Sequence, residues 1–236
     1  MRILAFLFAV VSTLTDGCSR DLSDPEVQKV HAAAEFYGPG PFQRAFAVSG
    51  RMTLPLVPRN ESWYALSFMV VSKPDGATGN SEFWQVGLIR WRSNYRLESF
   101  LAGRTRNGRF FFRSLGLLED GSHVVQLVGS NGKLQFILDG SEVASDNYEK
   151  YFEGLEPYLQ IMDEVSESGD QVAGRLSEVT IRHDDGTVST LSDSTCSLND
   201  RGVYWQRTGP TEFAAYGVFG RSDARTFGGN CRWYRP

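Results

Sequence analysis

Hydrophobic and polar residues alternate with a period of two through the middle of the chain, which predicts extended strands. The pattern is clearest over residues 121–146, where Asn131-Gly132 and Asp139-Gly140 interrupt the alternation. Asn-Gly tolerates the positive φ angles of a type I′ turn, the geometry that matches the twist of a hairpin. The segment therefore predicts a β-meander whose buried stripe consists of Leu134, Phe136 and Leu138.

Similar runs recur on both sides of this meander, separated by turn residues at 74–76, 107–108 and 185–186. The predicted strands cover 46–54, 63–71, 83–91, 95–101, 109–114, 158–163 and 177–182. Many short strands with turns between them predict an all-β sandwich, which we expect to span 42–186 as one domain. Residues 187–236 mix Gly, Arg, Ser and aromatic residues without alternation, so we expect a C-terminal extension packed on the sandwich.

The first residues predict export. Met1-Arg2 precedes nine apolar residues, and small and polar residues follow, which favours a signal peptide over 1–17 and a secreted, extracellular protein. Cys18 leaves a lipid anchor as a less favoured alternative, because Thr15 and Asp16 make a poor lipobox. Residues 18–41 form a lead-in, in which Asp24-Pro25-Glu26 predicts the start of a short surface helix over 25–35.

The meander has a recognisable order. Residues 123–143 follow the order H-x-V-x-L, a turn and then G-K-L-x-F-x-L-D-G-x-x-V. This order resembles the central meander of laminin-G-like domains, which are members of the concanavalin A-like jelly-roll class. Residues 174–182 resemble the strand that closes such domains. The resemblance implies an antiparallel jelly-roll β-sandwich. It also implies a glycan or protein ligand and leaves catalysis open, because lectins, adhesion modules, glucanases and polysaccharide lyases share this fold.

The charge balance and the cysteine content further narrow the classes of function that the sequence allows. The chain has 24 Lys and Arg against 28 Asp and Glu, so it lacks the basic footprint of a nucleic-acid-binding protein. Of its three cysteines, Cys18 lies at the predicted processing site, which leaves Cys196 and Cys231 as a predicted disulfide in the extension. Two free thiols, or a partner in another chain, are the alternatives. No spacing of Cys and His indicates zinc.

Separating the two faces of each middle strand gives a candidate binding surface. Trp84, Val86 and Leu88 form a contiguous apolar face, which we assign to the core. By the same rule the inward residues of the other strands are Leu97, Leu101, Phe110, Phe112, Leu159 and Ile161. The outward residues of interest are Gln85, Trp91, Arg96, Glu98, Arg113, Tyr158 and Gln160. Flat rings combined with forked donors suit a sugar ring and its hydroxyl or carboxylate groups.

This surface predicts a secreted, lectin-like glycan-binding domain, with anionic polysaccharides among its candidate ligands. Arg96 and Glu98 could instead form an ion pair on a solvated sheet. An alternative function is a polysaccharide lyase, because residues 151–160 faintly resemble an alginate-lyase signature whose final Tyr and Gln match Tyr158 and Gln160. Tyr158 would then transfer the proton. Gly87 stands where that family's Gln-x-His has its histidine. A protein-binding adhesion module is a further alternative.

Other chemistries find less support in the sequence. The E-x-D-x-E strand of related glucanases is absent, and residues 163–167 are interpreted as an exposed strand end. We predict no required cofactor. Asp163 with Asp184 and Asp185 could hold a calcium ion, as loop sites of laminin-G-like domains do, although His183 to Gly186 first predicts a polar turn. Motifs of serine hydrolases and phosphate-binding loops are absent from the sequence.

Overall fold

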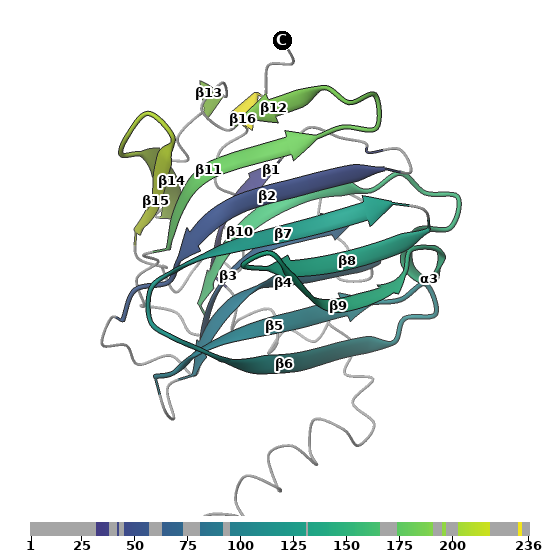
Figure 1. Cartoon of the computed structure of the whole chain (residues 1–236), viewed down its shortest axis with the longest axis horizontal. Coiled ribbons are helices and arrows are strands. Elements are labelled where there is room, and N and C mark those ends of the chain that lie inside the picture. Colours follow the sequence, from purple (N-terminus) through teal and green to yellow (C-terminus); the bar gives the residue numbers. More distant parts are fainter. Residues whose placement is uncertain are drawn as a thin grey trace, which may run out of the picture.

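The chain folds into two antiparallel sheets packed face to face (Figure 1). The computed structural model describes residues 32–37, 42, 45–56, 63–72, 81–91, 95–130, 132–165, 174–190, 195–196, 203–217 and 231–232. The predicted signal segment 1–17 and Cys18 lie outside these residues. None of the described helices has the length and apolar character needed to cross a bilayer.

One sheet has six strands. Its strand order is β1 (Ala32–Tyr37), β10 (Tyr158–Val165), β3 (Trp63–Val71), β4 (Phe83–Trp91), β5 (Leu97–Arg104) and β6 (Phe110–Leu118). Every neighbouring pair is antiparallel. Strands distant in sequence, such as β3 and β10, therefore lie side by side, which is the feature that assembles the site described below.

The second sheet contains the predicted meander. Its strand order is β14 (Val203–Arg207), β15 (Glu212–Gly217), β11 (Arg175–Arg182), β2 (Phe46–Thr53), β7 (Ser122–Ser130), β8 (Lys133–Leu138) and β9 (Ser141–Asn147), and β12 (Val188–Thr190) also pairs with β11. A separate ribbon pairs β13 (Thr195–Cys196) with β16 (Cys231–Arg232), and one short helix, α3 (Glu149–Phe152), follows β9. Strands β1, β14 and β15 show that residues on both sides of 42–186 contribute to the two sheets.

The core between the sheets confirms most of the predicted inward residues. Leu134, Phe136 and Leu138 are buried, and the Asp139-Gly140 turn has positive φ at both residues, 49° and 84°. The remaining confirmed inward residues are Trp84, Val86, Leu88, Leu97, Leu101, Leu159 and Ile161. These strands carry a strong contrast between an apolar and a more polar face, so burial selects one orientation.

Two predictions about local structure are wrong. Residues 32–35 were expected to end a helix, but they belong to β1, which pairs with β10 from Ala32 opposite Val165 to Tyr37 opposite Gln160. The backbone hydrogen bonds offered by the edge of β10 outweigh the local helix signals, because helix propensity differs by less than about 1 kcal/mol per ordinary residue. Residues 25–31 lie outside the described part of the chain.

The second wrong prediction concerns β6. Phe110 and Phe112 were expected to point inward, but β6 pairs them with Arg104 and Ala102 on the outer face of the sheet. Phe111 packs against the core in their place. Three consecutive phenylalanines offer no polar contrast between faces, so the alternation carries no information about which ring is buried.

Candidate functional site

The outer face of the six-stranded sheet, which points away from the second sheet, carries polar side chains from three neighbouring strands. Strand pairing places Gln85, Met69 and Gln160 in one row across β4, β3 and β10. The next row along these strands contains Gly87, Ser67 and Met162. Polar side chains from three strands therefore meet on one surface.

Gln85 is the centre of this group. Its amide Nε2 donates one hydrogen bond to Ser67 Oγ at 2.8 Å and another to Glu164 Oε2 at 2.6 Å. Gln85 is 7% exposed and Ser67 is fully buried, whereas Glu164 is partly exposed. The amide thus crosses diagonally over Ser67 to reach the carboxylate, and both of its hydrogens have partners.

Close packing of β3 against β4 supports this geometry. A Cβ atom added at Gly87 would lie 2.2 Å from the carbonyl oxygen of Leu66 and 2.7 Å from Ser67 Cα. Only glycine fits at this position without moving the backbone. A histidine two residues after Gln85, as the alginate-lyase signature requires, is incompatible with this contact.

An aromatic cluster flanks the polar group on the β5 and β6 side. Phe100 stacks on Phe112 with ring centres 5.5 Å apart, and Trp91 meets Phe112 edge to face at 5.7 Å. Glu98 accepts hydrogen bonds from Trp91 Nε1 at 3.1 Å and from Ser114 Oγ at 2.6 Å. The face therefore combines flat apolar surface with two separate carboxylates, Glu98 and Glu164.

The structure brings together only some of the predicted site residues. Gln85, Gln160, Tyr158, Trp91 and Glu98 share the outer face, as expected. Arg96 is exposed just before β5. Arg113 was expected outward, but it pairs with Leu101 on the side of β6 that points toward the second sheet, and its guanidinium lies 5.5 Å from the centre of the Phe111 ring.

Tyr158 is separated from the Gln85–Glu164 pair. It lies six residues before Glu164 on the same strand, a distance of about 20 Å at 3.3 Å per residue. Glu164 was not predicted as a site residue, because residues 163–167 were interpreted from the sequence as an exposed strand end. The outward alternation of Tyr158, Gln160 and Met162, extended by one step, would have placed Glu164 on the same face.

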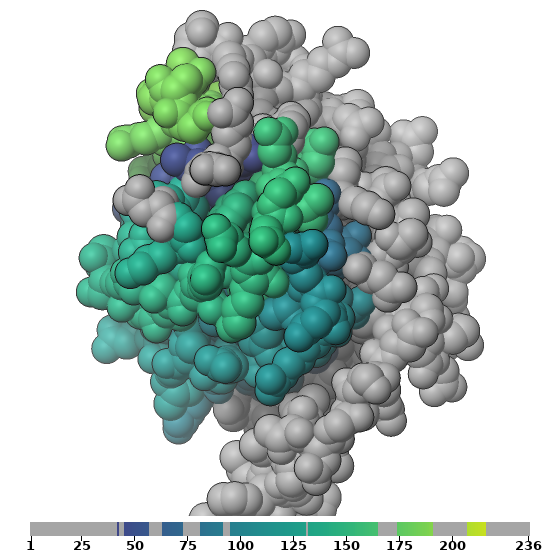
Figure 2. Space-filling view, turned by 90° about the vertical axis from the view of Figure 1, so that its right-hand side faces the viewer, coloured from purple at the N-terminus to yellow at the C-terminus, as the bar shows by residue number. Residues whose placement is uncertain are grey.

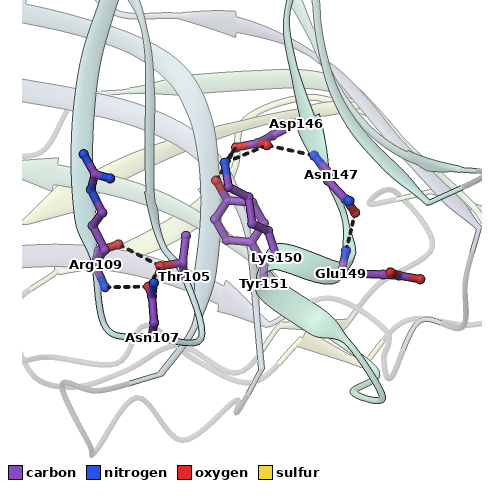
Figure 3. Close-up of polar contacts among 8 residues, drawn as sticks. All are labelled: Thr105, Asn107, Arg109, Asp146, Asn147, Glu149, Lys150 and Tyr151. Carbon is purple, nitrogen blue, oxygen red and sulfur yellow. Dashed lines mark hydrogen bonds and ion pairs between the residues drawn. The ribbon is translucent and has the colours of Figure 1, made fainter.

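A second polar cluster closes one end of the sandwich (Figure 3). Asp146 accepts hydrogen bonds from Tyr151 Oη at 2.7 Å, Lys150 Nζ at 2.9 Å and the Asn147 backbone N–H at 2.8 Å. Burial by itself would raise the pKa of Asp146, but the bonds from Tyr151 and Lys150 outweigh it and hold that pKa below its usual value. Burial, together with Asp146, strongly raises the pKa of the Tyr151 phenol, so this hydroxyl stays protonated.

This end cluster ties α3 to the turn between β5 and β6. The Arg106 backbone N–H donates to the Lys150 carbonyl at 3.2 Å, and the Arg106 and Glu153 side chains form an ion pair. Figure 2 shows the same junction from the side, where the green residues around α3 lie against teal residues of the first sheet. Because its donors and acceptors satisfy one another, we interpret the cluster as structural.

The predicted calcium ligands do not meet. Asp163 is buried and accepts hydrogen bonds from Gly174 N at 2.8 Å and Tyr64 Oη at 3.3 Å. Asp185 instead accepts the backbone N–H of Thr187 at 2.9 Å, within the predicted polar turn. Among the described residues, no group of three or more His, Cys, Asp or Glu side chains could hold a metal ion.

Comparison with known proteins identifies the fold and leaves the family open. No protein-family model and no curated protein sequence matches the chain. Scytalido-glutamic peptidase bound to a peptide-based transition-state analogue superposes with a TM-score of 0.53 and 12% identity, over 80% of this chain and 98% of that one. SCP-B, a member of the Eqolisin family of peptidases solved with the tripeptide Ala-Ile-His, gives 0.50 and 13% over the same shares.

An alginate lyase from Pseudomonas aeruginosa gives a TM-score of 0.47 and 13% identity, over 60% of this chain and 65% of the lyase. The present chain thus spans about two thirds of that enzyme's length. At such low identity these similarities concern the fold alone. With the sheet topology, the two peptidase structures confirm the predicted concanavalin A-like jelly-roll fold.

Proposed function

We propose that this protein is a hydrolase that cleaves peptide bonds on the outer face of the six-stranded sheet. Glu164 acts as the general base and Gln85 as the hydrogen-bond donor to the oxyanion. The observation that carries the proposal is the 2.6 Å hydrogen bond between Gln85 Nε2 and Glu164 Oε2, a carboxylate and an amide donor brought together from β10 and β4.

These two groups can perform the steps of amide hydrolysis. Glu164 takes a proton from a water molecule as the water oxygen attacks the peptide carbonyl carbon. The carbonyl electron pair moves to oxygen, and the Gln85 N–H stabilises the resulting oxyanion. When the C–N bond breaks, the protonated Glu164 returns its proton to the leaving nitrogen, giving a free carboxyl group and a free amine.

Ser67 has a positioning role in this scheme. Its Oγ accepts one of the two amide hydrogens of Gln85, at 2.8 Å. With the amide plane held in this orientation, the second hydrogen points toward Glu164 Oε2, and the oxyanion can accept it in place of that carboxylate oxygen. Because Ser67 is fully buried, this contact is shielded from exchange with water.

The chemistry of the pair favours acyl transfer over glycoside cleavage. Glycosidases usually place two carboxyl groups about 5–10 Å apart across the scissile bond, one of them supplying a proton. Gln85, which donates a hydrogen bond to Glu164, carries an amide, and an amide stabilises an oxyanion but cannot act as a proton-donating acid. Two structures with the same fold belong to peptidases, one of them named a glutamic peptidase, which agrees with this proposal.

The experiment compares cleavage of a denatured, fluorescently labelled protein by the wild type and three variants across a range of pH. We expect Glu164→Gln to reduce kcat/KM by about 10²–10⁴ and Gln85→Ala by about 10²–10³. Glu98→Gln is the matched control. Glu98 lies on the same face as Glu164, but its carboxylate accepts hydrogen bonds from Trp91 and Ser114 and has no role in the proposed mechanism. Unchanged cleavage by Glu164→Gln would refute the proposal.

Glycan binding without turnover is the second candidate for this face. The supporting observation is the packing of Trp91 against Phe112 beside the polar atoms of Glu98, a combination that suits a sugar ring. A glycan array with neutral and uronate polymers tests it. Binding that Trp91→Ala removes without unfolding the domain would support this function, and an array without any bound glycan would exclude the polymers it contains.

The lyase alternative has less support. Gly87 leaves no room for a histidine, and Tyr158 lies far from Glu164 along β10. A lyase would give a rise in ultraviolet absorbance on incubation with alginate or glucuronan, and Tyr158→Phe would abolish this rise. An absorbance trace that stays flat would exclude the lyase function for these polymers. A role in protein adhesion stays a prediction from the fold resemblance.

A further inference from the structure

β6 is the last strand of the six-stranded sheet, and it has β5 as its only partner among the described strands. Residues 110–114 are in regular register with β5, and an irregularity opposite Ser99 and Phe100 ends that run. Phe110, Arg113 and Ser114 are exposed. A regular, exposed edge strand presents backbone N–H and C=O groups that can pair with another extended chain.

Along this edge, three alternate residues form a row that was not predicted from the sequence. Phe111 and Arg113 lie on the side of β6 toward the second sheet, and Arg109 precedes them at the same two-residue spacing. We call Arg109, Phe111 and Arg113 the arginine row. Its two cationic residues are about 13 Å apart along the strand, with an aromatic ring between them.

The charges of the arginine row are available to a ligand. Within the described part of the chain neither Arg109 nor Arg113 forms an ion pair, whereas Arg90, Arg106 and Lys150 each do. The Arg113 guanidinium lies 5.5 Å from the centre of the Phe111 ring, a contact that restricts its orientation. Two exposed arginines without an ion-pair partner among the described residues, on one strand edge, favour an acidic partner.

We propose that β6 binds an extended acidic peptide segment as an additional strand. The bound segment has the pattern acid–x–apolar–x–acid, so that its acidic side chains face Arg109 and Arg113 and its apolar side chain faces Phe111. Backbone pairing supplies affinity and the alternate side chains supply selectivity. An extended peptide uses both the free strand edge and the charges, whereas an anionic glycan would use the charges alone.

This surface is distinct from the Gln85–Glu164 pair. β6 lies two strands away from β4, and the arginine row is on the opposite side of the sheet. Binding at the edge therefore does not depend on the proposed hydrolase activity, and each can fail without the other.

Fluorescence anisotropy tests the proposal with a labelled peptide, acetyl-Thr-Glu-Thr-Val-Thr-Glu-Thr-amide, titrated with the full-length protein. We expect saturable binding that Arg113→Glu weakens at least tenfold and that Arg109→Glu also weakens. Arg182→Glu makes the same charge change on the exposed end of β11, in the other sheet, and should leave binding unchanged. Repeating the titration with Glu164→Gln excludes cleavage of the peptide as a source of signal.

A peptide with the same side chains but with N-methyl groups on alternate backbone nitrogens separates strand pairing from simple charge attraction. We expect it to bind at least tenfold more weakly, because it cannot form the ladder. Equal binding of the N-methylated peptide would overturn the proposal, and so would absence of binding by either peptide. Displacement by polyglucuronate with no effect of N-methylation would assign the row to an anionic glycan instead.

Discussion

At the scale of single residues, the meander tests the predicted faces of β8. Phe136 is fully buried between the sheets, whereas its neighbour Gln135 is partly exposed and its amide donates to Glu142 at 2.6 Å. Phe136→Ala should lower the free energy of unfolding by about 3–5 kcal/mol, because it removes a large apolar side chain and leaves a cavity. Gln135→Ala should cost far less. Urea denaturation of the two variants measures this, and equal losses would contradict the observed orientation.

Asp139 links one turn of the meander to acid stability. Burial acts to raise its pKa, but hydrogen bonds from His123 and the Val124 backbone N–H outweigh it, so the pKa is lowered from its usual 3.8. The folded state therefore binds this proton less readily than the unfolded state. Stability from this group is present above about pH 4, the unfolded pKa, and is lost as the pH falls through the lower folded value.

Asp139→Asn should consequently flatten the decline in stability between about pH 5 and 2. Asparagine is the matched substitution, because it tolerates the positive φ of 49° at this turn. Thermal unfolding of both proteins across this range measures the effect. A parallel decline for wild type and variant would show that Asp139 does not contribute to acid sensitivity.

At the scale of elements, the contact between β3 and β4 depends on Gly87. Its absent side chain lets the strands approach, and an added Cβ would meet the backbone oxygen of Leu66 at 2.2 Å. Gly87→Ala should lower the free energy of unfolding by at least about 1–3 kcal/mol, since the contacting atom belongs to the backbone and cannot rotate away. It should also reduce activity more than stability explains, because Ser67 lies directly opposite.

Chemical denaturation and cleavage assays on the same Gly87→Ala preparation test both effects. Retained stability with normal activity would show that the strands accommodate the methyl group. The comparison is informative because Gly87 makes no hydrogen bond to substrate in the proposed mechanism. Any loss of activity therefore comes from displacement of Gln85 or Ser67.

At the scale of the whole molecule, the predicted disulfide joins residues far apart in sequence. The side chains of Cys196 and Cys231 lie outside the described structure, but β13 and β16 place the two residues directly opposite each other. Opposed residues of antiparallel strands have Cα atoms about 4.5–5.5 Å apart, within the range that a disulfide requires. A bridge closing roughly 35 residues would stabilise the fold by about 3–4 kcal/mol on the chain-entropy model.

Peptide mapping without reduction should therefore recover Cys196 and Cys231 in one linked fragment from protein made in an oxidising host. Substitution of both Cys196 and Cys231 by serine should lower the melting temperature. This double variant is also the control for measurements of the wild type in the presence of reductant. Free thiols at both positions would contradict the prediction of a disulfide-linked C-terminal extension.

Between residues 46 and 182, the sequence by itself determined most of the strands and the orientation of those with unequal faces. In β4, Trp84, Val86 and Leu88 alternate with Gln85 and Gly87, and burial of the apolar set fixes which side faces the core. Where the two faces are alike, as at Phe110, Phe111 and Phe112, the same rule had no basis for a choice. Local helix signals near residue 32 failed for a related reason, since they carry no information about the free edge of β10 that recruits β1.

Only the tertiary structure decided which residues form the site. Gln85 and Glu164 are 79 positions apart, and they meet because β4, β3 and β10 are neighbours in the sheet. Strand order depends on how the whole sandwich buries its apolar faces and closes its loops, whereas alternation reports only local exposure. For this reason the sequence could identify Gln85 as an outward polar residue, but the folded sheet was required to show that Glu164 is its partner.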